Sequence, residues 1–141
     1  MTTDMETKVQ LQVQKEIRQA EDNLVNWIQD ALDQTNYGKS GKDKLEESQF
    51  RNLVRVSDTT ESPEVIKNFL RYQVGREQKW GRGERSLAER IISDIDGNIK
   101  TAADAIAKKT GSQDGRGIWI ELIRRYLGYG ARYLKYLNDG R

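Results

Sequence analysis

The 141-residue chain carries 24 Lys and Arg against 22 Asp and Glu, and it contains neither His nor Cys. These two absences exclude disulfides, thiolate nucleophiles, Ser-His triads and the usual zinc or iron ligands. The length suits one domain, and three Trp and six Tyr argue against disorder. No apolar run approaches the ~20 residues of a bilayer span and no signal peptide is recognisable, so we expect a cytoplasmic protein without a membrane partner.

The charge is divided unevenly along the chain. Residues 1–66 hold 8 Lys and Arg and 13 Asp and Glu, a net charge of −5, whereas residues 67–141 hold 16 and 9, a net charge of +7. This asymmetry suggests an anionic partner for the second half, or attraction between copies. An unevenly charged but merely solvated surface is the alternative.

The first predicted element is one long helix over residues 7–34, followed by a loop over residues 36–44. Its apolar residues recur at spacings of four and three and form one stripe, namely Val13, Ile17, Ala20, Leu24, Trp27 and Ala31. The stripe could form a coiled-coil seam, but about three heptads favour packing on its own domain. Gly38-Lys39-Ser40 resembles the end of a phosphate-binding loop, but Asp33 replaces the required Gly and no strand precedes it, which excludes a nucleotide site.

Two short helices joined by a turn come next. Ser48 is the expected N-cap of the first, which runs through Val56, and Ser62 followed by Pro63 begins the second. Arg51 and Arg55 are four residues apart and therefore share a helix face. In the second helix, Gly75 would allow another backbone to approach closely.

Basic residues then alternate with an aromatic residue over residues 76–85. Arg76, Lys79, Arg82 and Arg85 surround Trp80 and two Gly. This pattern suits a phosphate backbone with an occasional stacked base. Alternatively, the segment is a surface loop whose Trp folds back onto the core.

The remaining residues also show helical periodicity. We expect a helix over residues 84–95, a break or kink at residues 96–98, a helical continuation to Lys109 and an end at Thr110-Gly111. A last helix over residues 118–137 contains Gly130 and Ala131, which would let another helix approach closely. Arg125, Arg132 and Lys135 line the stripe opposite its apolar face, as in a backbone-reading helix or any solvated helix.

The predicted fold class is therefore all-α, because no segment alternates with a period of two over a convincing length. We expect a single domain over residues 1–141, built as an irregular bundle of five to six helices with a long N-terminal helix. Residues 1–46 hold that helix and its loop, and residues 47–141 form the helical core.

Three segments together resemble a known family. They are residues 48–52 (SQFRN), residues 67–76 (KNFLRYQVGR) and the aromatic and basic residues 125–136. In this order they resemble the small subunit of type III CRISPR–Cas effector complexes, of the Csm type, over residues 48–137. Phe50 stands where Ile or Leu is usual in that family.

The resemblance implies a non-catalytic, all-helical subunit that needs no cofactor or metal. Several copies would stack along the crRNA and target RNA, beside the backbone and large subunits of the complex, and would bind the nucleic-acid backbone without regard to sequence. Arg51, Arg71 and Arg76 match the motif arginines, while the last helix matches only a basic tendency. Some of these arginines could instead pair with carboxylates inside the fold.

The candidate nucleic-acid-binding residues combine the motif arginines with the other basic clusters. They are Arg51, Arg55, Arg71, Arg76, Lys79, Arg82, Arg85, Arg125, Arg132 and Lys135. A second hypothesis is a helical adaptor that binds only proteins through its acidic N-terminal half. A third, an enzyme using Glu84, Glu89 and Asp94, has no support beyond the presence of those carboxylates, so we expect no catalytic residues.

Overall fold

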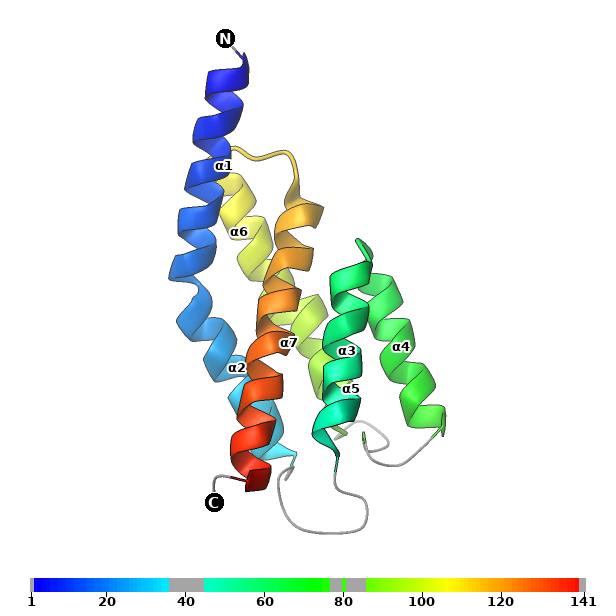
Figure 1. The fold of residues 1–141 in the computed structure, drawn as a ribbon. Coiled ribbons are helices and arrows are strands. Elements are labelled where there is room, and N and C mark those ends of the chain that lie inside the picture. Colours follow the sequence, from blue (N-terminus) through cyan, green and yellow to red (C-terminus); the bar gives the residue numbers. More distant parts are fainter. Residues whose placement is uncertain (1, 36–44, 77–79, 81–85, 140–141) are drawn as a thin grey trace.

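The computed structural model describes residues 2–35, 45–76, 80 and 86–139, and the side chains from residue 4 onward. These residues form helices joined by turns, with no strand among them, so the all-α prediction is confirmed (Figure 1). In chain order the elements are α1 (Thr2–Gln19), α2 (Glu21–Gln34), α3 (Glu47–Thr59), α4 (Pro63–Arg76), α5 (Leu87–Asp94), the π-helical turn η1 (Ile95–Ile99), α6 (Lys100–Thr110) and α7 (Gly115–Asp139). No helix in these ranges is long and apolar enough to span a bilayer.

The C-terminal helix α7 is the centre of the fold. It is the longest helix, with 25 residues, and it packs against α2, α3 and α6 (Figure 1). Its inward side is apolar at nearly every position, with Ile118, Ile120, Leu122, Ile123, Tyr126, Leu127, Leu134 and Leu137 buried. Burial of such side chains stabilises the fold by roughly 1.5–3 kcal/mol each.

The N-terminal segment forms two helices instead of the single long helix expected. Ala20 separates them, and its N–H donates to the carbonyls of both Glu16 (3.1 Å) and Ile17 (3.0 Å). Shared bonds of this kind are common where a helix ends. Most of the predicted apolar stripe is nevertheless buried against the rest of the chain, which favours packing within one domain over a coiled-coil seam. The first part of α1 projects beyond the other helices (Figure 1).

Of the two N-caps predicted for α3 and α4, the one for α3 is wrong. Glu46, not Ser48, precedes α3, and its backbone N–H donates to Gln49 Oε1 (2.9 Å) in a capping box. At α4 the prediction is confirmed, because Val65 N–H donates to Ser62 Oγ (3.4 Å) and Pro63 is the first residue. Gly75 makes no close contact, since a Cβ there would meet no heavy atom within 4 Å.

The segment from α5 to α6 is continuous, with the predicted irregularity in its middle. Ser86 caps α5 by accepting a hydrogen bond from Glu89 N–H (3.1 Å), and η1 occupies the expected break. Buried Lys67 of α4 ties this turn in place through an ion pair with Asp96 (2.8 Å), and it also pairs with Glu64 (2.8 Å) on its own helix. Gly111 ends α6 as predicted, with a φ of 75° that favours glycine.

Trp80 belongs to the core. Its side chain is fully buried, and its ring stacks on Phe50 with 5.7 Å between the ring centroids. Of the two alternatives for the basic segment, the structure therefore shows the Trp folded inward, where it cannot stack on a base. Lys79, Arg82 and Arg85 lie outside the described residues.

A buried polar pair links α5 to α7. Tyr126 Oη donates to Asp94 Oδ2 (2.6 Å), and Arg90 Nε lies 3.5 Å from Asp94 Oδ1. Burial raises the pKa of the Asp94 carboxyl above its ordinary 3.8, although Tyr126 and Arg90 oppose that rise. Burial and the neighbouring Asp94 together raise the pKa of the Tyr126 hydroxyl well above 10.

Neighbouring helices approach α7 closely at Gly130. A Cβ there would lie 2.7 Å from Ile28 Cγ1 and 2.7 Å from Phe50 Cζ, whereas one at Gly128 would meet nothing within 4 Å. We expect Gly130→Ala to lower the free energy of unfolding by about 1–2 kcal/mol, because overpacking outweighs the better helix propensity of Ala. Gly128→Ala should raise it by about 0.5–1 kcal/mol. Urea unfolding of both variants measures this, and stabilisation by Gly130→Ala would contradict the contact.

The Asp94 carboxyl should leave a signature in the pH dependence of stability. The folded state holds its proton more tightly than the unfolded chain, so this group contributes less stability as pH rises from 3.8 through the raised pKa. Asp94→Asn has no such proton. The free energy of unfolding of Asp94→Asn minus that of the wild type should therefore increase as the pH rises across this range. The increase should be about 1.4 kcal/mol for each pKa unit by which the folded-state pKa of Asp94 exceeds its unfolded-state pKa. Asp104→Asn, which replaces an exposed carboxylate, is the control. A difference between Asp94→Asn and the wild type that did not change with pH would contradict the prediction.

Candidate nucleic-acid interface

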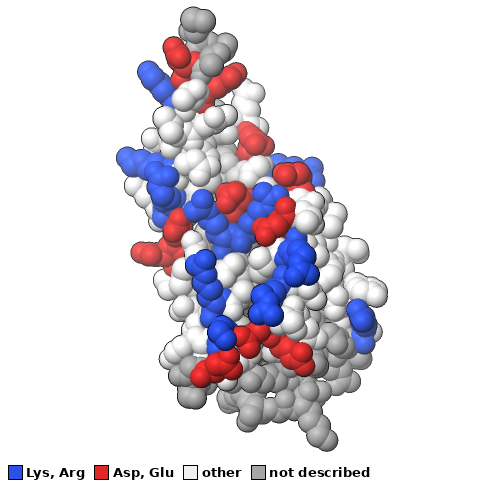
Figure 2. Space-filling view, in the orientation of Figure 1, with Lys and Arg blue, Asp and Glu red and all other residues white. Residues whose placement is uncertain are grey.

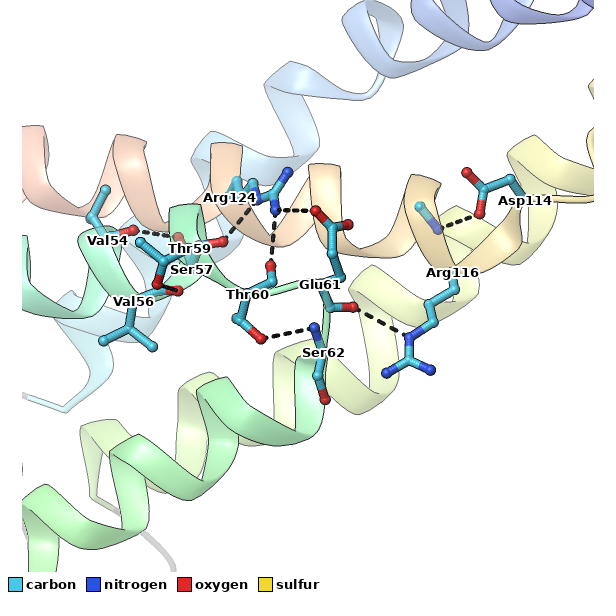
Figure 3. A network of polar contacts seen from close by, with 11 residues as sticks. Val54, Val56, Ser57, Thr59, Thr60, Glu61, Ser62, Asp114, Arg116 and Arg124 are labelled. Atoms are coloured by element: carbon cyan, nitrogen blue, oxygen red, sulfur yellow. Dashed lines mark hydrogen bonds and ion pairs between the residues drawn. The ribbon is translucent and has the colours of Figure 1, made fainter.

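Arg124 is an arginine that holds the fold together. Its Nε donates to the carbonyl of Ser57 (2.8 Å), and its Nη2 donates to the carbonyl of Thr60 (2.9 Å) and to Glu61 Oε1 (3.3 Å) (Figure 3). These carbonyls lie where α3 ends, so they lack partners within the helix. Arg116 Nε adds a bond to the carbonyl of Glu61 (3.3 Å). The α3–α4 turn is thereby fastened to α7.

Arg125, a predicted binding residue, is also engaged inside the fold. Its Nη1 lies 2.6 Å from Glu21 Oε1 of α2, and its Nε lies 3.0 Å from Glu121 Oε2 on its own helix. The side chain is half-buried between the two carboxylates. Its charge is therefore largely balanced locally, and it joins α2 to α7.

Five other predicted residues, Arg71 among them, are exposed and make no ion pair with the described residues. Arg51 and Arg55 project from α3, Arg76 from the last turn of α4, and Arg132 from α7. Arg55 Nη1 donates to Asn52 Oδ1 (3.1 Å), and the Arg132 guanidinium lies 6.0 Å from the centre of the Tyr129 ring. Neither contact neutralises a positive charge.

Lys135 is exposed as well, but it has acidic neighbours. Its Nζ lies 3.0 Å from Asp139 Oδ2 and 3.5 Å from Glu47 Oε1, and these carboxylates raise the pKa of the ammonium. Exposed pairs of this kind contribute little to stability and are readily exchanged for another anion.

The exposed cations of α3 and α7 lie on one face. The two helices run antiparallel, with Glu47 of α3 beside Lys135 and Ser57 beside Arg124. Figure 2 shows Lys and Arg in two columns over α3 and α7, with uncharged surface between them and acidic groups above and below. We name Arg51, Arg55, Arg132 and Lys135 the α3–α7 basic surface.

The side chains of Arg71 and Arg76 project from different sides of α4. They are five residues apart, which turns their side chains about 140° from one another on a helix. Arg76 shares the α3 side with Phe69 and Gln73, whereas Arg71 projects away from it. The two arginines of the second motif therefore reach different surroundings.

A cleft of about 180 Å³ lies between α3 and α4. Gln49 and Asn52 line it from α3, and Phe69, Gln73 and Arg76 line it from α4. All five residues come from the first two segments on which the family resemblance rests. The sequence pattern gives no sign of this cleft, because Gln49, Asn52 and Gln73 stand out in it only as parts of the motifs.

A second hollow has the opposite electrostatic character. It measures about 950 Å³ and lies between the projecting part of α1 and the start of α7. Glu6, Asp114 and Glu121 line it together with Met5 and Val9, and no Lys or Arg does so among the described residues. Three carboxylates repel phosphate, so this hollow does not suit a nucleic acid.

The described residues contain no group of three or more Asp or Glu placed to hold a metal ion. Of the carboxylates considered for catalysis, Glu89 is exposed on α5, Asp94 is buried against Tyr126, and Glu84 lies outside the described residues. Glu89 and Asp94 therefore do not share a site.

Comparisons of the chain with protein-family models, curated proteins and solved structures gave no match. The α3–α7 basic surface gathers exposed positive charges on one face. Arginine guanidinium groups suit phosphate because each can bind two oxygens at once.

Removing Arg124 should loosen the α3–α4 turn. We expect Arg124→Ala to lower the free energy of unfolding by about 2 kcal/mol, because two partly buried carbonyls lose a charged hydrogen-bond donor. Arg132→Ala, on the exposed side of the same helix, should change it by less than about 0.5 kcal/mol. Denaturant unfolding of both variants tests the assignment, and equal effects would contradict it.

Proposed function

We propose that the protein binds the backbone of RNA, without regard to sequence, as the non-catalytic small subunit of a type III CRISPR ribonucleoprotein. The observation that carries the proposal is the α3–α7 basic surface, extended by Arg76. Arg51, Arg55, Arg76 and Arg132 keep exposed charges, while Arg124 and Arg125 serve the fold.

The chemistry of this surface suits a guided complex. Base pairing between guide and target supplies sequence selectivity there, so the protein needs only phosphate and shape contacts. The absence of His and Cys from the chain is compatible with such a role. Other copies, the backbone subunits and the large subunit are the proposed protein partners, with crRNA and target RNA as the nucleic acids.

The salt dependence of binding gives a quantitative test. If each of the five cations meets a phosphate, the logarithm of the affinity for single-stranded RNA should fall with the logarithm of salt concentration with a slope of about −3.5. Arg51→Gln combined with Arg55→Gln should reduce the steepness by about 1.4. Fluorescence anisotropy across a salt series measures both slopes.

A matched control removes two charges elsewhere. Lys15 on α1 and Lys108 on α6 are exposed and make no ion pair with the described residues. Lys15→Gln combined with Lys108→Gln should therefore leave the slope close to that of the wild type. Equal losses in the two double variants would show that net charge, rather than this surface, drives binding. An affinity independent of salt would overturn the proposal.

The assembly itself can be tested by purification. A tagged chain expressed with its native neighbours should retain short guide RNA and larger protein subunits, and Arg51→Gln with Arg55→Gln should retain less RNA. Elution of the chain alone would contradict membership in a ribonucleoprotein.

One observation favours the adaptor alternative. The projecting α1 exposes Met5 (67%) and Leu11 (66%), and Met5 borders the acidic hollow. A basic and apolar protein segment would complement that surface. If Met5→Gln with Leu11→Gln abolished assembly while the basic-surface variants bound RNA like the wild type, the adaptor function would be the better account.

A further inference from the structure

We infer that the cleft between α3 and α4 holds one unpaired nucleobase of the bound RNA. This inference rests on the proposed function and deepens it, because it adds a base subsite to a surface that otherwise contacts only phosphates. The cleft residues are Gln49, Asn52, Phe69, Gln73 and Arg76.

The size of the cleft selects a small, flat ligand. Its volume of about 180 Å³ is below the roughly 300–1,000 Å³ of pockets that enclose drug-sized molecules. A single aromatic ring system fits that space. Half-buried Phe69 provides a wall whose ring can stack on such a ligand.

The polar residues of the cleft match the edges of a base. Gln73 is half-buried and makes no hydrogen bond with the described residues, and its amide offers both a donor and an acceptor. Asn52 Oδ1 accepts from Arg55, which leaves the amide nitrogen of that side chain for the ligand. Unpaired bases in RNA complexes are typically held by one aromatic ring and a few such polar groups.

Arginines flank the cleft on both sides. Arg76 lines its α4 wall, and the hydrogen bond to Asn52 holds Arg55 at the α3 rim. A nucleotide with its base in the cleft would therefore find a guanidinium toward each neighbouring phosphate. The cleft adjoins the α3–α7 basic surface through Arg55, so a strand following that surface reaches it.

The test compares two strands of equal length and charge, one an ordinary single-stranded RNA and the other lacking its bases. The wild type should bind the ordinary strand about tenfold more tightly, as expected for one stacked base. Phe69→Leu keeps the apolar volume but removes the ring, and should abolish most of that preference. Tyr72→Leu, an exposed aromatic three residues away, should leave the preference unchanged.

Gln73→Ala provides a second variant that does not disturb the core. It should reduce the preference for the ordinary strand by about fivefold through the lost hydrogen bond. If circular dichroism shows that Phe69→Leu does not fold, Gln73→Ala becomes the test of the base subsite. Equal, salt-dependent binding of both strands by the wild type would overturn the base subsite and leave the proposed function standing. Loss of the preference in Tyr72→Leu alone would also overturn it, and failure to bind either strand would overturn both.

Discussion

Three helices meet at the Cα of Gly130, and the rest of the fold depends on that contact. The Phe50 ring and the Ile28 side chain occupy the space that a larger residue would fill, so α2 and α3 both lie directly against α7. Phe50 in turn stacks on Trp80, which places this Trp side chain against the same centre. Because Arg51 follows Phe50 in α3, burial of the Phe50 ring turns the Arg51 side chain toward the surface.

The arginines of α7 divide into two groups by their surroundings. Arg124 and Arg125 lie next to one another in sequence, yet one binds backbone carbonyls of α3 and the other binds carboxylates of α2 and α7. Arg132, two turns further on, has only an aromatic neighbour among the described residues. A guanidinium whose hydrogen bonds are satisfied within the fold has little left for a ligand, so the second group is the one available to phosphate.

Much of the fold could be predicted from the sequence, because apolar periodicity reports directly on burial. The stripe from Val13 to Ala31, the Ser62-Pro63 start of α4 and the Gly111 end of α6 all follow from local rules. The break at Ala20 could not be predicted, since no Pro or Gly marks it. The partners of Arg124, and the Glu21 partner of Arg125, could not be predicted either, because they come from residues about 60 to 100 positions away. The cleft likewise requires two helices to be placed side by side.

The π-helical turn η1 determines which neighbouring helices α5 and α6 pack against. A π turn accommodates one more residue than an α turn, which rotates everything after it by about 100°. The apolar side of α5 therefore faces α2 and α4, while that of α6 faces α1 and α7. The continuous segment from α5 to α6 thus packs against two different pairs of helices. The rotation that η1 introduces between α5 and α6 lets both helices bury their isoleucines.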